Sequence, residues 1–239
     1  MATDLQTTAD NYTSTIVAGW EKLYREKRRR LYELLQPWFK PGRALELGTG
    51  DGESTSHIAN EFDELHVVDG SPAQLEAVRT RFPRVHAHCS LFEAFEAPCR
   101  YSTIFMTHIL EHLDRPEVLL ERSASWLEDG GRVMISVPNA LSLHRLVGVK
   151  MGMLATPYSL NEQDVLLGHR RVYDKTSMLE LIARTPFDVV RFTGLMLKPL
   201  SNRQIERDWS PELIEAYFQL GFDFPENCSE IIFILEKRP

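Results

Sequence analysis

The chain has 239 residues, of which 43% are hydrophobic and 10% aromatic, enough for one sizeable α/β core and too many for a globally disordered chain. Its formal net charge of −7 leaves no general basic field for a nucleic-acid backbone. Three widely spaced cysteines fit neither a disulfide framework nor a zinc motif, and no apolar run approaches a membrane span. We therefore expect a single cytoplasmic domain without nucleic-acid or membrane partners.

The first 40 residues are expected to form an N-terminal helical segment. Apolar residues recur with helical spacing over residues 21–39, and Pro37 and Pro41 interrupt the pattern. The basic run from Lys27 to Arg30 within it is interpreted as a solvated helix face, with an anion-binding patch as the alternative.

From residue 44 onward, strand-length apolar runs alternate with helix-length patterns. The expected strands cover residues 44–47, 64–69, 84–89, 102–108 and 131–139, and the expected helices cover 54–62, 71–82 and 116–127. This alternation predicts βαβ units and a parallel sheet.

After Pro138 the alternation stops. Residues 139–172 form a connection too long for a passive loop, and we expect it to fold over the strand ends as a substrate lid. A helix over 175–185, a strand over 187–194, a helix over 210–221 and a strand over 230–237 are expected to follow. The whole chain, 1–239, is thus interpreted as one domain, with a second insertion at 195–228.

A cluster of glycines, Gly48, Gly50 and Gly52, follows the first strand and precedes a helix. Glycines there allow a tight turn and a close approach of the backbone to a ligand. Asp69 ends the next strand, 21 residues after Gly48, where a carboxylate can accept hydrogen bonds from both ribose hydroxyls. The pair predicts a nucleotide-type ligand. Glu53 stands where a dinucleotide-binding pattern has its third glycine, which weakens a nicotinamide or flavin reading.

Four segments, residues 46–52, 67–72, 108–113 and 127–139, resemble the class I S-adenosylmethionine-dependent methyltransferases. The resemblance covers roughly residues 40–140. It implies an α/β, doubly wound Rossmann-like fold: a seven-stranded sheet, mostly parallel with an antiparallel last strand at 230–237, and helices on both faces. It also implies S-adenosyl-L-methionine as cofactor and S-adenosyl-L-homocysteine as product.

The resemblance extends to individual cofactor contacts. Those it implies are Glu46, Gly48, Thr49, Gly50, Gly52, Asp69, Gly70, Ser71, Ser90, Leu91, Phe92 and Thr107. Asp69 would hold the ribose, and Thr107 would lie under the sulfonium end. The family often has an acid where this chain has Cys89 and Ser90, so backbone N–H groups and packing from Leu91 and Phe92 are expected to recognise adenine.

Two histidines are candidates for a catalytic base. Methyl transfer depends largely on positioning, but a hydroxyl acceptor would also benefit from a group with a pKa near neutrality. His108 and His112 lie just after the fourth strand, four residues apart. The alternative for His112 is a packing or capping role. No metal is expected, because no third ligand with convincing spacing follows these two histidines.

The end of the lid gathers His169, Arg170, Arg171 and Tyr173, a composition that suits a carboxylate or phosphate. The alternative is a solvated loop with ion pairs to Asp164 or Asp174. Further expected substrate contacts are Asn139, His144 and Tyr12. The remaining histidines, His57, His66, His86 and His88, fall at helix or strand positions and are interpreted as structural.

The leading hypothesis is a methyltransferase acting on oxygen or nitrogen of a small polar, anionic metabolite. Phosphorylated, carboxylate and sugar-type acceptors from surface-polysaccharide or secondary-metabolite biosynthesis all suit it. The alternatives are a protein or RNA methyltransferase, a non-catalytic adenosine-binding module, and an oxidoreductase of related topology. The oligomeric state is left open, with a homodimer as one expectation.

Overall fold

The computed structural model describes residues 21–238, and its centre is a seven-stranded sheet in the order β3-β2-β1-β4-β5-β7-β6. The strands are β1 (Arg43–Leu47), β2 (Glu64–Asp69), β3 (His86–Cys89), β4 (Tyr101–Thr107), β5 (Leu127–Pro138), β6 (Phe187–Leu195) and β7 (Glu230–Lys237). Neighbours from β3 to β5 are parallel, whereas β7 is antiparallel to both β5 and β6. The predicted sheet, with its antiparallel last strand, is confirmed.

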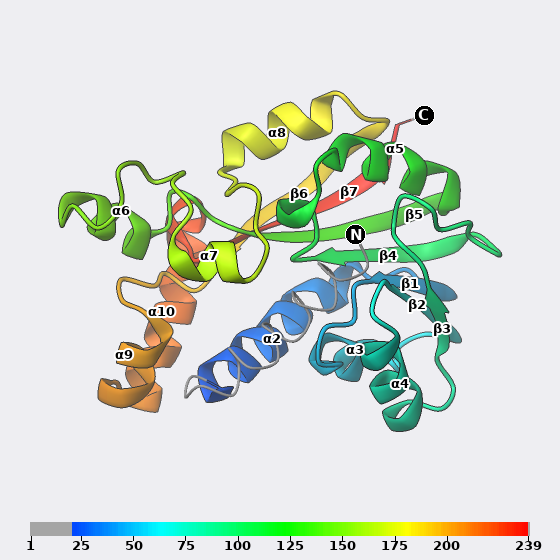
Figure 1. Ribbon diagram of the computed structural model, residues 1–239, viewed down its shortest axis with the longest axis horizontal. Helices are drawn as coiled ribbons and strands as arrows, with labels where there is room; N and C mark the ends of the chain where they lie inside the picture. The colour runs from blue at the N-terminus through cyan, green and yellow to red at the C-terminus, as the bar shows by residue number, and fades with distance from the viewer. Residues whose placement is uncertain (1–20, 239) are drawn as a thin grey trace.

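Helices cover both faces of the sheet. They are α2 (Glu21–Leu35), α3 (Glu53–Ile58), α4 (Pro72–Arg81), α5 (Pro116–Trp126), α6 (Leu143–Lys150), α7 (Glu162–Leu166), α8 (Lys175–Ala183), α9 (Asn202–Asp208) and α10 (Pro211–Asp223). In Figure 1, α5 and α8 lie above the sheet and α2, α3 and α4 below it. The long connection after residue 139 contains α6 and α7, and residues 195–228 contain α9 and α10.

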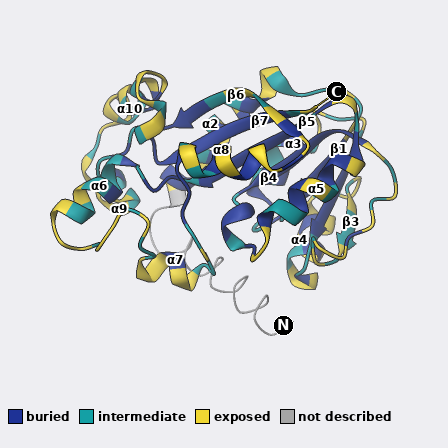
Figure 2. Cartoon of the chain, turned by 90° about the horizontal axis from the view of Figure 1, so that it is seen from above, coloured by how far each residue is buried: buried dark blue, intermediate teal, exposed yellow. Residues whose placement is uncertain are grey.

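Alternating side chains of the strands build two cores, one on each face. In β4, Ile104 and Met106 join the core under α5 and α8, and Phe105 joins the core that packs against α2, α3 and α4. This is the period-2 pattern of a strand buried on both sides. Figure 2 shows the sheet as the most buried layer, with exposed residues on the outer helices.

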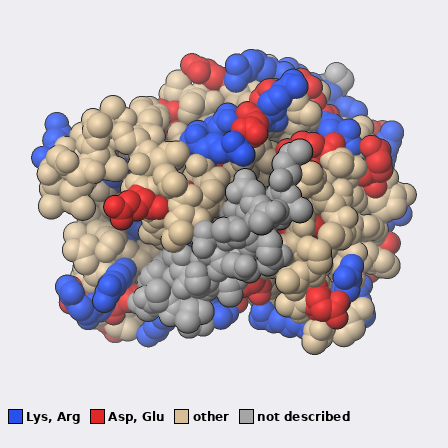
Figure 3. Space-filling model, in the orientation of Figure 1, with Lys and Arg blue, Asp and Glu red and all other residues tan. Residues whose placement is uncertain are grey.

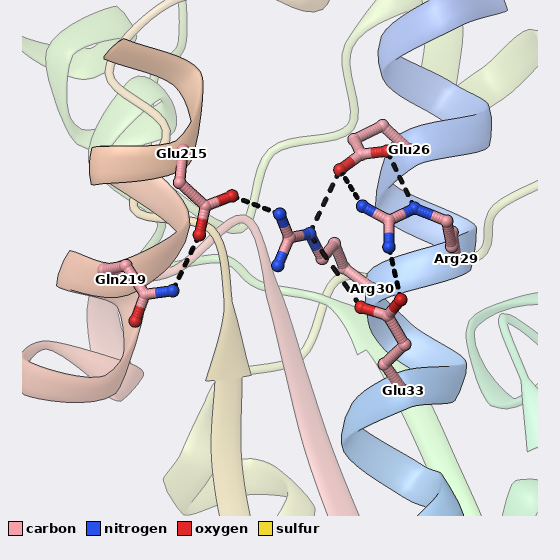
Figure 4. Close-up of polar contacts among 6 residues, drawn as sticks. All are labelled: Glu26, Arg29, Arg30, Glu33, Glu215 and Gln219. Atoms are coloured by element: carbon pink, nitrogen blue, oxygen red, sulfur yellow. Dashed lines mark hydrogen bonds and ion pairs between the residues drawn. The ribbon is translucent and has the colours of Figure 1, made fainter. Parts of the chain in front are cut away.

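Helix α2 is fixed to the sheet by its apolar stripe and tied to α10 by charged side chains. Leu23, Leu31 and Leu35 are buried against the sheet. On the opposite side, Arg30 contacts both Glu26 of its own helix and Glu215 of α10 (Figure 4). The prediction of a solvated face for the run from Lys27 to Arg30 is therefore wrong for Lys27 and Arg28, whose side chains are only 11% and 7% exposed and pair with Glu230.

The surface mixes both signs of charge. On the face seen in Figure 3, lysine and arginine are interspersed with aspartate and glutamate. None of the helices between residues 21 and 238 combines the length and apolar composition needed to cross a bilayer.

Candidate active site

A glycine loop joins β1 to α3 at the carboxyl edge of the sheet. Gly48, Gly50 and Gly52 have φ angles of 76°, 50° and 76°, a region that residues with a Cβ rarely adopt. A Cβ on Gly48 would also lie 2.5 Å from Cδ1 of Ile109. Glycine is therefore required here, and the loop presents bare backbone at the strand end.

Asp69 lies at the carboxyl end of β2, across from this loop. Its Oδ2 accepts hydrogen bonds from the backbone N–H and the hydroxyl of Thr49, at 2.9 and 3.2 Å. Its Oδ1 accepts from the N–H of Ser71 at 2.8 Å, across the half-buried Gly70. The carboxylate is thus held in one orientation while remaining partly exposed, so both oxygens can accept from a vicinal diol.

Glu46 lies beneath the loop and is fully buried. Its Oε2 accepts from the hydroxyl of Thr55 at 2.7 Å, and Oε1 has no hydrogen-bond partner among the described residues. Burial raises its pKa to about 8, more than Thr55 lowers it, and the nearby Asp69 raises it further. An unpartnered buried oxygen beside bare backbone fits a ligand that carries hydrogen-bond donors, as S-adenosylmethionine does.

The residues predicted to border adenine follow β3, next to Asp69. The N–H of Ser90 donates to the carbonyl of Asp69 at 3.1 Å. Leu91 is 42% exposed, whereas Phe92 is half-buried and lies close to the position that a Cβ on Gly48 would occupy. An exposed aliphatic side chain and an adjacent aromatic ring suit the flat face of a base.

β4 ends at Thr107, and His108, which follows it, lines a cavity. The hydroxyl of Thr107 is 3.3 Å from that of Tyr32 on α2. His108 has a φ of 57°, stabilised by a hydrogen bond from its N–H to the carbonyl of Ser136 at 2.9 Å. A non-glycine residue in this region is uncommon and marks a constrained position.

Both ring nitrogens of His108 face carboxylates. Nε2 is 2.8 Å from Glu230 and Nδ1 is 3.2 Å from Glu111. Burial and the positive charge of Arg28 lower the pKa of His108, but the two carboxylates outweigh them and raise it above its ordinary value. The geometry therefore favours an imidazolium, which cannot accept a proton as the predicted base would.

Glu230, the first residue of β7, is the centre of a buried charge cluster. It forms ion pairs with Lys27 and with Arg28, the latter at 3.5 Å, in addition to its contact with His108. Burial opposes ionisation, but Lys27 and His108 hold its pKa well below the ordinary value. One carboxylate thus faces three cationic groups, and the cluster carries a surplus of positive charge.

A cavity of about 840 Å³ opens beside this cluster, bordered by α2, the lid and the segment after β6. Its basic lining residues are Lys27, Arg28, Arg145, Lys198 and Arg203. The acids that line it are Glu230 and Asp164, and four histidines also line it. The cavity is therefore predominantly basic in a protein whose net charge is negative.

Lys198 is the lysine of this cavity that has no acidic partner among the described residues. It is 7% exposed and donates to the side-chain oxygen of Asn202 at 2.8 Å, and no carboxylate pairs with it among residues 21–238. Burial and the neighbouring Lys27 lower its pKa to about 7, although Glu230 partly opposes this. Burial and the same two lysines lower the pKa of His144 to about 2, which keeps that cavity-lining imidazole neutral.

His112 and His169 form a second corner of the cavity. Their rings meet edge to face with centroids 4.8 Å apart, and Nδ1 of His169 is 3.2 Å from Asp164. Burial lowers the pKa of His112, so it is the better-placed neutral imidazole of the two predicted bases. The fold also supplies a third potential metal ligand that the sequence did not reveal, since ligand atoms of Glu111, His112 and His169 lie within 4.8 Å of one another.

The two arginines predicted to bind an anion do not line the cavity. Arg170 pairs with Asp114 at 2.7 Å and donates to the carbonyl of His112. Arg171 donates to the carbonyls of Leu113 and Asp114. Their guanidinium groups fasten the lid to the segment after β4, which corresponds to the structural alternative, although Asp114 replaces the expected Asp164 or Asp174.

The other predicted substrate contacts are divided. Asn139 lines the cavity, but its amide donates to the carbonyls of Glu226 and Cys228, so it fixes backbone. Tyr173 pairs with Asn139 through an isolated backbone β-bridge. It is buried and does not line the cavity. Tyr12 lies outside the described residues.

Several charged side chains that line the cavity were not predicted from the sequence. Lys198 and Glu230 carry no local motif, and the fold alone brings them to the cavity. Lys27 and Arg28 belong to the basic run whose anion-binding alternative was considered second. The basic composition of this run was therefore the sequence feature that could have identified Lys27 and Arg28 as anion-binding residues.

The comparisons with known proteins agree with this site. A family model described as "Methyltransferase domain" matches residues 20–191. The chain is 34% identical over 131 residues, 51% of this chain and 49% of the relative, to a protein named trans-aconitate 2-methyltransferase from Methylobacterium radiotolerans. It is 33% identical over 134 residues, 53% of this chain and 45% of the relative, to a malonyl-[acyl-carrier protein] O-methyltransferase from Halorhodospira halophila.

Solved structures extend the likeness over the whole fold. The N-methyltransferase NodS from Bradyrhizobium japonicum, in complex with S-adenosyl-L-homocysteine, aligns with a TM-score of 0.61 and 11% identity over 98% of both chains. The chain spans about half the length of the curated relatives it matches. Because the family model covers more than half of the chain, and the sheet has seven strands with the last one antiparallel, the chain belongs to the methyltransferase-domain family and has the fold of class I S-adenosylmethionine-dependent methyltransferases.

Proposed function

We propose that the protein transfers a methyl group from S-adenosylmethionine to oxygen or nitrogen of a small anionic metabolite, with a carboxylate as the favoured anion. The observation that carries the proposal is the buried Lys198, which lines the cavity and has no carboxylate partner among the described residues. An uncompensated cation is costly to bury, and an anionic ligand would compensate it. The relatives named for trans-aconitate and malonyl substrates support the same class, since both names denote carboxylates.

The chain's own residues would divide the work between two sites. Asp69 would accept hydrogen bonds from the ribose, and Glu46 and the glycine loop would surround the amino-acid end of the cofactor. The cofactor supplies an electrophilic methyl group when bound. Lys198, with Lys27 and Arg28, would hold the anion and so orient the acceptor, which is the main requirement of a displacement reaction.

Proton removal would fall to a neutral group where the acceptor needs it. His112 is buried, its pKa is lowered, and it lines the cavity, so it is the preferred base for a hydroxyl acceptor. His108 would act as a fixed positive charge at the boundary between the two sites. An ionised carboxylate acceptor would need no base at all. Surface-polysaccharide and secondary-metabolite pathways remain the settings in which we expect such acceptors.

The test is a labelled-methyl transfer assay with a matched panel of acceptors. Trans-aconitate, malonyl and succinyl thioesters, a sugar phosphate and their uncharged amide or alcohol analogues would be incubated with methyl-labelled cofactor. We expect transfer to at least one anion and at least about tenfold less to its neutral analogue, the equivalent of about 1.4 kcal/mol. Label appearing only in protein or RNA from a lysate would contradict the proposal.

A further inference from the structure

A second cluster of ligating side chains lies at the opposite, amino-terminal end of β2 and β3. Glu64 and His66 alternate along β2, and His86 and His88 alternate along β3. Because strand residues two apart share a face, and because His66 pairs in register with His86, the four side chains form one patch. The rings of His86 and His88 lie 4.7 and 5.0 Å from that of His66. The methyltransfer site uses none of them.

The contacts of His66 are compatible with a metal ion between its ring and Glu64. Its Nδ1 is 3.0 Å from Nε2 of His88 and 3.1 Å from the hydroxyl of Tyr101, so it can donate its hydrogen within the patch. In that tautomer Nε2 presents its lone pair to Oε1 of Glu64, 2.7 Å away, and a cation can bridge the two atoms. In the other tautomer Nε2 donates its own hydrogen to the carboxylate, and the metal would replace that hydrogen.

The third side chain favours the metal. Nε2 of His86 is 3.6 Å from the same oxygen of Glu64, and the three ligand atoms all lie within 4.8 Å of one another. A tetrahedral zinc ion with bonds of about 2.1 Å would hold its ligand atoms about 3.4 Å apart. The distances from Oε1 of Glu64 to Nε2 of His66 and to Nε2 of His86 are 2.7 and 3.6 Å, and each differs from this expected separation by about 0.7 Å or less.

We propose that Glu64, His66 and His86 bind a zinc ion, with a water molecule as the fourth ligand. Two imidazoles and one carboxylate are a donor set that zinc prefers over magnesium or calcium. His86 must turn its ring, which is tilted by 25° from that of His66, so that both point at the ion. Its side chain is 55% exposed, which leaves it room to turn.

The surroundings of the site resemble the outer layer of a metal centre. His66 is the buried member, with 6% of its side chain exposed, and the contacts of its Nδ1 to His88 and Tyr101 fix the ring and direct Nε2 toward Glu64. Such partners commonly orient a ligating histidine. The ion would join β3, the last strand at this edge of the sheet, to β2, whose other end carries Asp69. The site does not depend on the proposed methyltransferase activity.

Competition between the metal-free protein and a chromophoric chelator for zinc would test the site. The variants are His86→Ala and Glu64→Gln. The control Glu76→Gln removes an exposed charge from α4, and His169→Ala removes a ligand atom from the separate group in the active-site cavity. His86 is exposed on an edge strand, so its replacement leaves the core intact. Circular dichroism would confirm that each variant folds.

We expect the wild-type protein and Glu76→Gln to bind zinc equally, and His86→Ala and Glu64→Gln to bind it at least about tenfold more weakly, since even changes in outer-layer partners cost that much. Zinc should raise the unfolding temperature of the wild type and not that of His86→Ala. Cobalt bound at the site should give the visible spectrum of a four-coordinate ion. The proposal is overturned if the wild type binds no zinc, if His86→Ala binds it unchanged, or if only His169→Ala loses it.

Discussion

At the scale of single residues, the cofactor cleft depends on a carboxylate that backbone hydrogen bonds hold in place. We predict that Asp69→Asn weakens binding of S-adenosylhomocysteine roughly 10- to 150-fold, because a hydrogen bond to a charged group contributes about 1.5–3 kcal/mol. The new amide would also direct N–H groups at the N–H of Thr49 or Ser71. Isothermal titration calorimetry would measure the affinity. The exposed Asp63→Asn serves as the control, and equal affinity of the two variants would remove Asp69 from the ribose site.

Lys198 gives a prediction about pH. Its pKa of about 7 means that the ammonium form, which binds an anion, is present below pH 7 and is lost as the pH rises through that value. For an anionic substrate, kcat/KM should therefore fall above pH 7, mainly through KM. Lys198→Arg should move this fall to higher pH because guanidinium stays charged, and Lys198→Met should raise KM at every pH. A pH profile identical in the wild type and Lys198→Arg would show that another group is responsible.

The residue scale is also where prediction from sequence was least complete. Gly48 and Asp69 could be found because their roles follow from local backbone requirements and a fixed spacing. The contact of His108 with Glu230 joins residues 122 positions apart, and it exists because β7 inserts between β5 and β6. Glu111 stands only three residues after His108, but Glu230 could not be assigned to His108 from the local sequence.

At the scale of elements, apolar periodicity was a sufficient guide wherever a helix packs on the sheet. Helices α2, α4, α5 and α8 lie within predicted segments, and α10 ends two residues beyond its predicted segment. The short α7 and α9 were not predicted, because each buries a single residue, Asp164 and Ile205 respectively. Capping boxes begin both helices, so local polar bonds rather than an apolar stripe define them.

Helix α2 allows the apolar and ionic contributions to be compared directly. Leu31 is fully buried against the sheet, and we predict that Leu31→Ala lowers the free energy of unfolding by about 2–5 kcal/mol. Arg29 is 44% exposed and, within residues 21–238, pairs only with acids of its own helix, so Arg29→Ala should cost about 0.5 kcal/mol or less per pair. Urea denaturation would measure both. Similar losses would mean that charge, rather than burial, fixes this helix.

At the scale of the whole molecule, the sheet divides the functions along its carboxyl edge. The loops after β1, β2 and β3 carry the residues predicted to bind the cofactor, and α2, the lid, the segment after β6 and the start of β7 line the basic cavity. The end of β4 lies between them. This division follows from the reversal of strand order between β1 and β4, the place where open α/β sheets bind their ligands.

One buried side chain connects the turns of the lid. Arg145 donates to the carbonyls of Pro157 and Ser159 and pairs with Asp164 at 3.0 Å. Removing one partner of a buried ion pair is costly, about 3–5 kcal/mol. We predict that Arg145→Met speeds hydrogen exchange over residues 143–168 and raises KM for the acceptor.

We expect Arg145→Met to bind S-adenosylhomocysteine with an affinity within about threefold of that of the wild type. Among the described residues, no hydrogen bond joins Arg145 to Asp69 or its partners. Hydrogen–deuterium exchange with mass spectrometry would locate the change, and the exposed Lys150→Met provides a control within the same segment. If exchange rises throughout the sheet instead, the lid does not open as a separate unit and its stability is coupled to the whole domain. If exchange and KM both stay unchanged, the network around Arg145 does not hold the cavity closed.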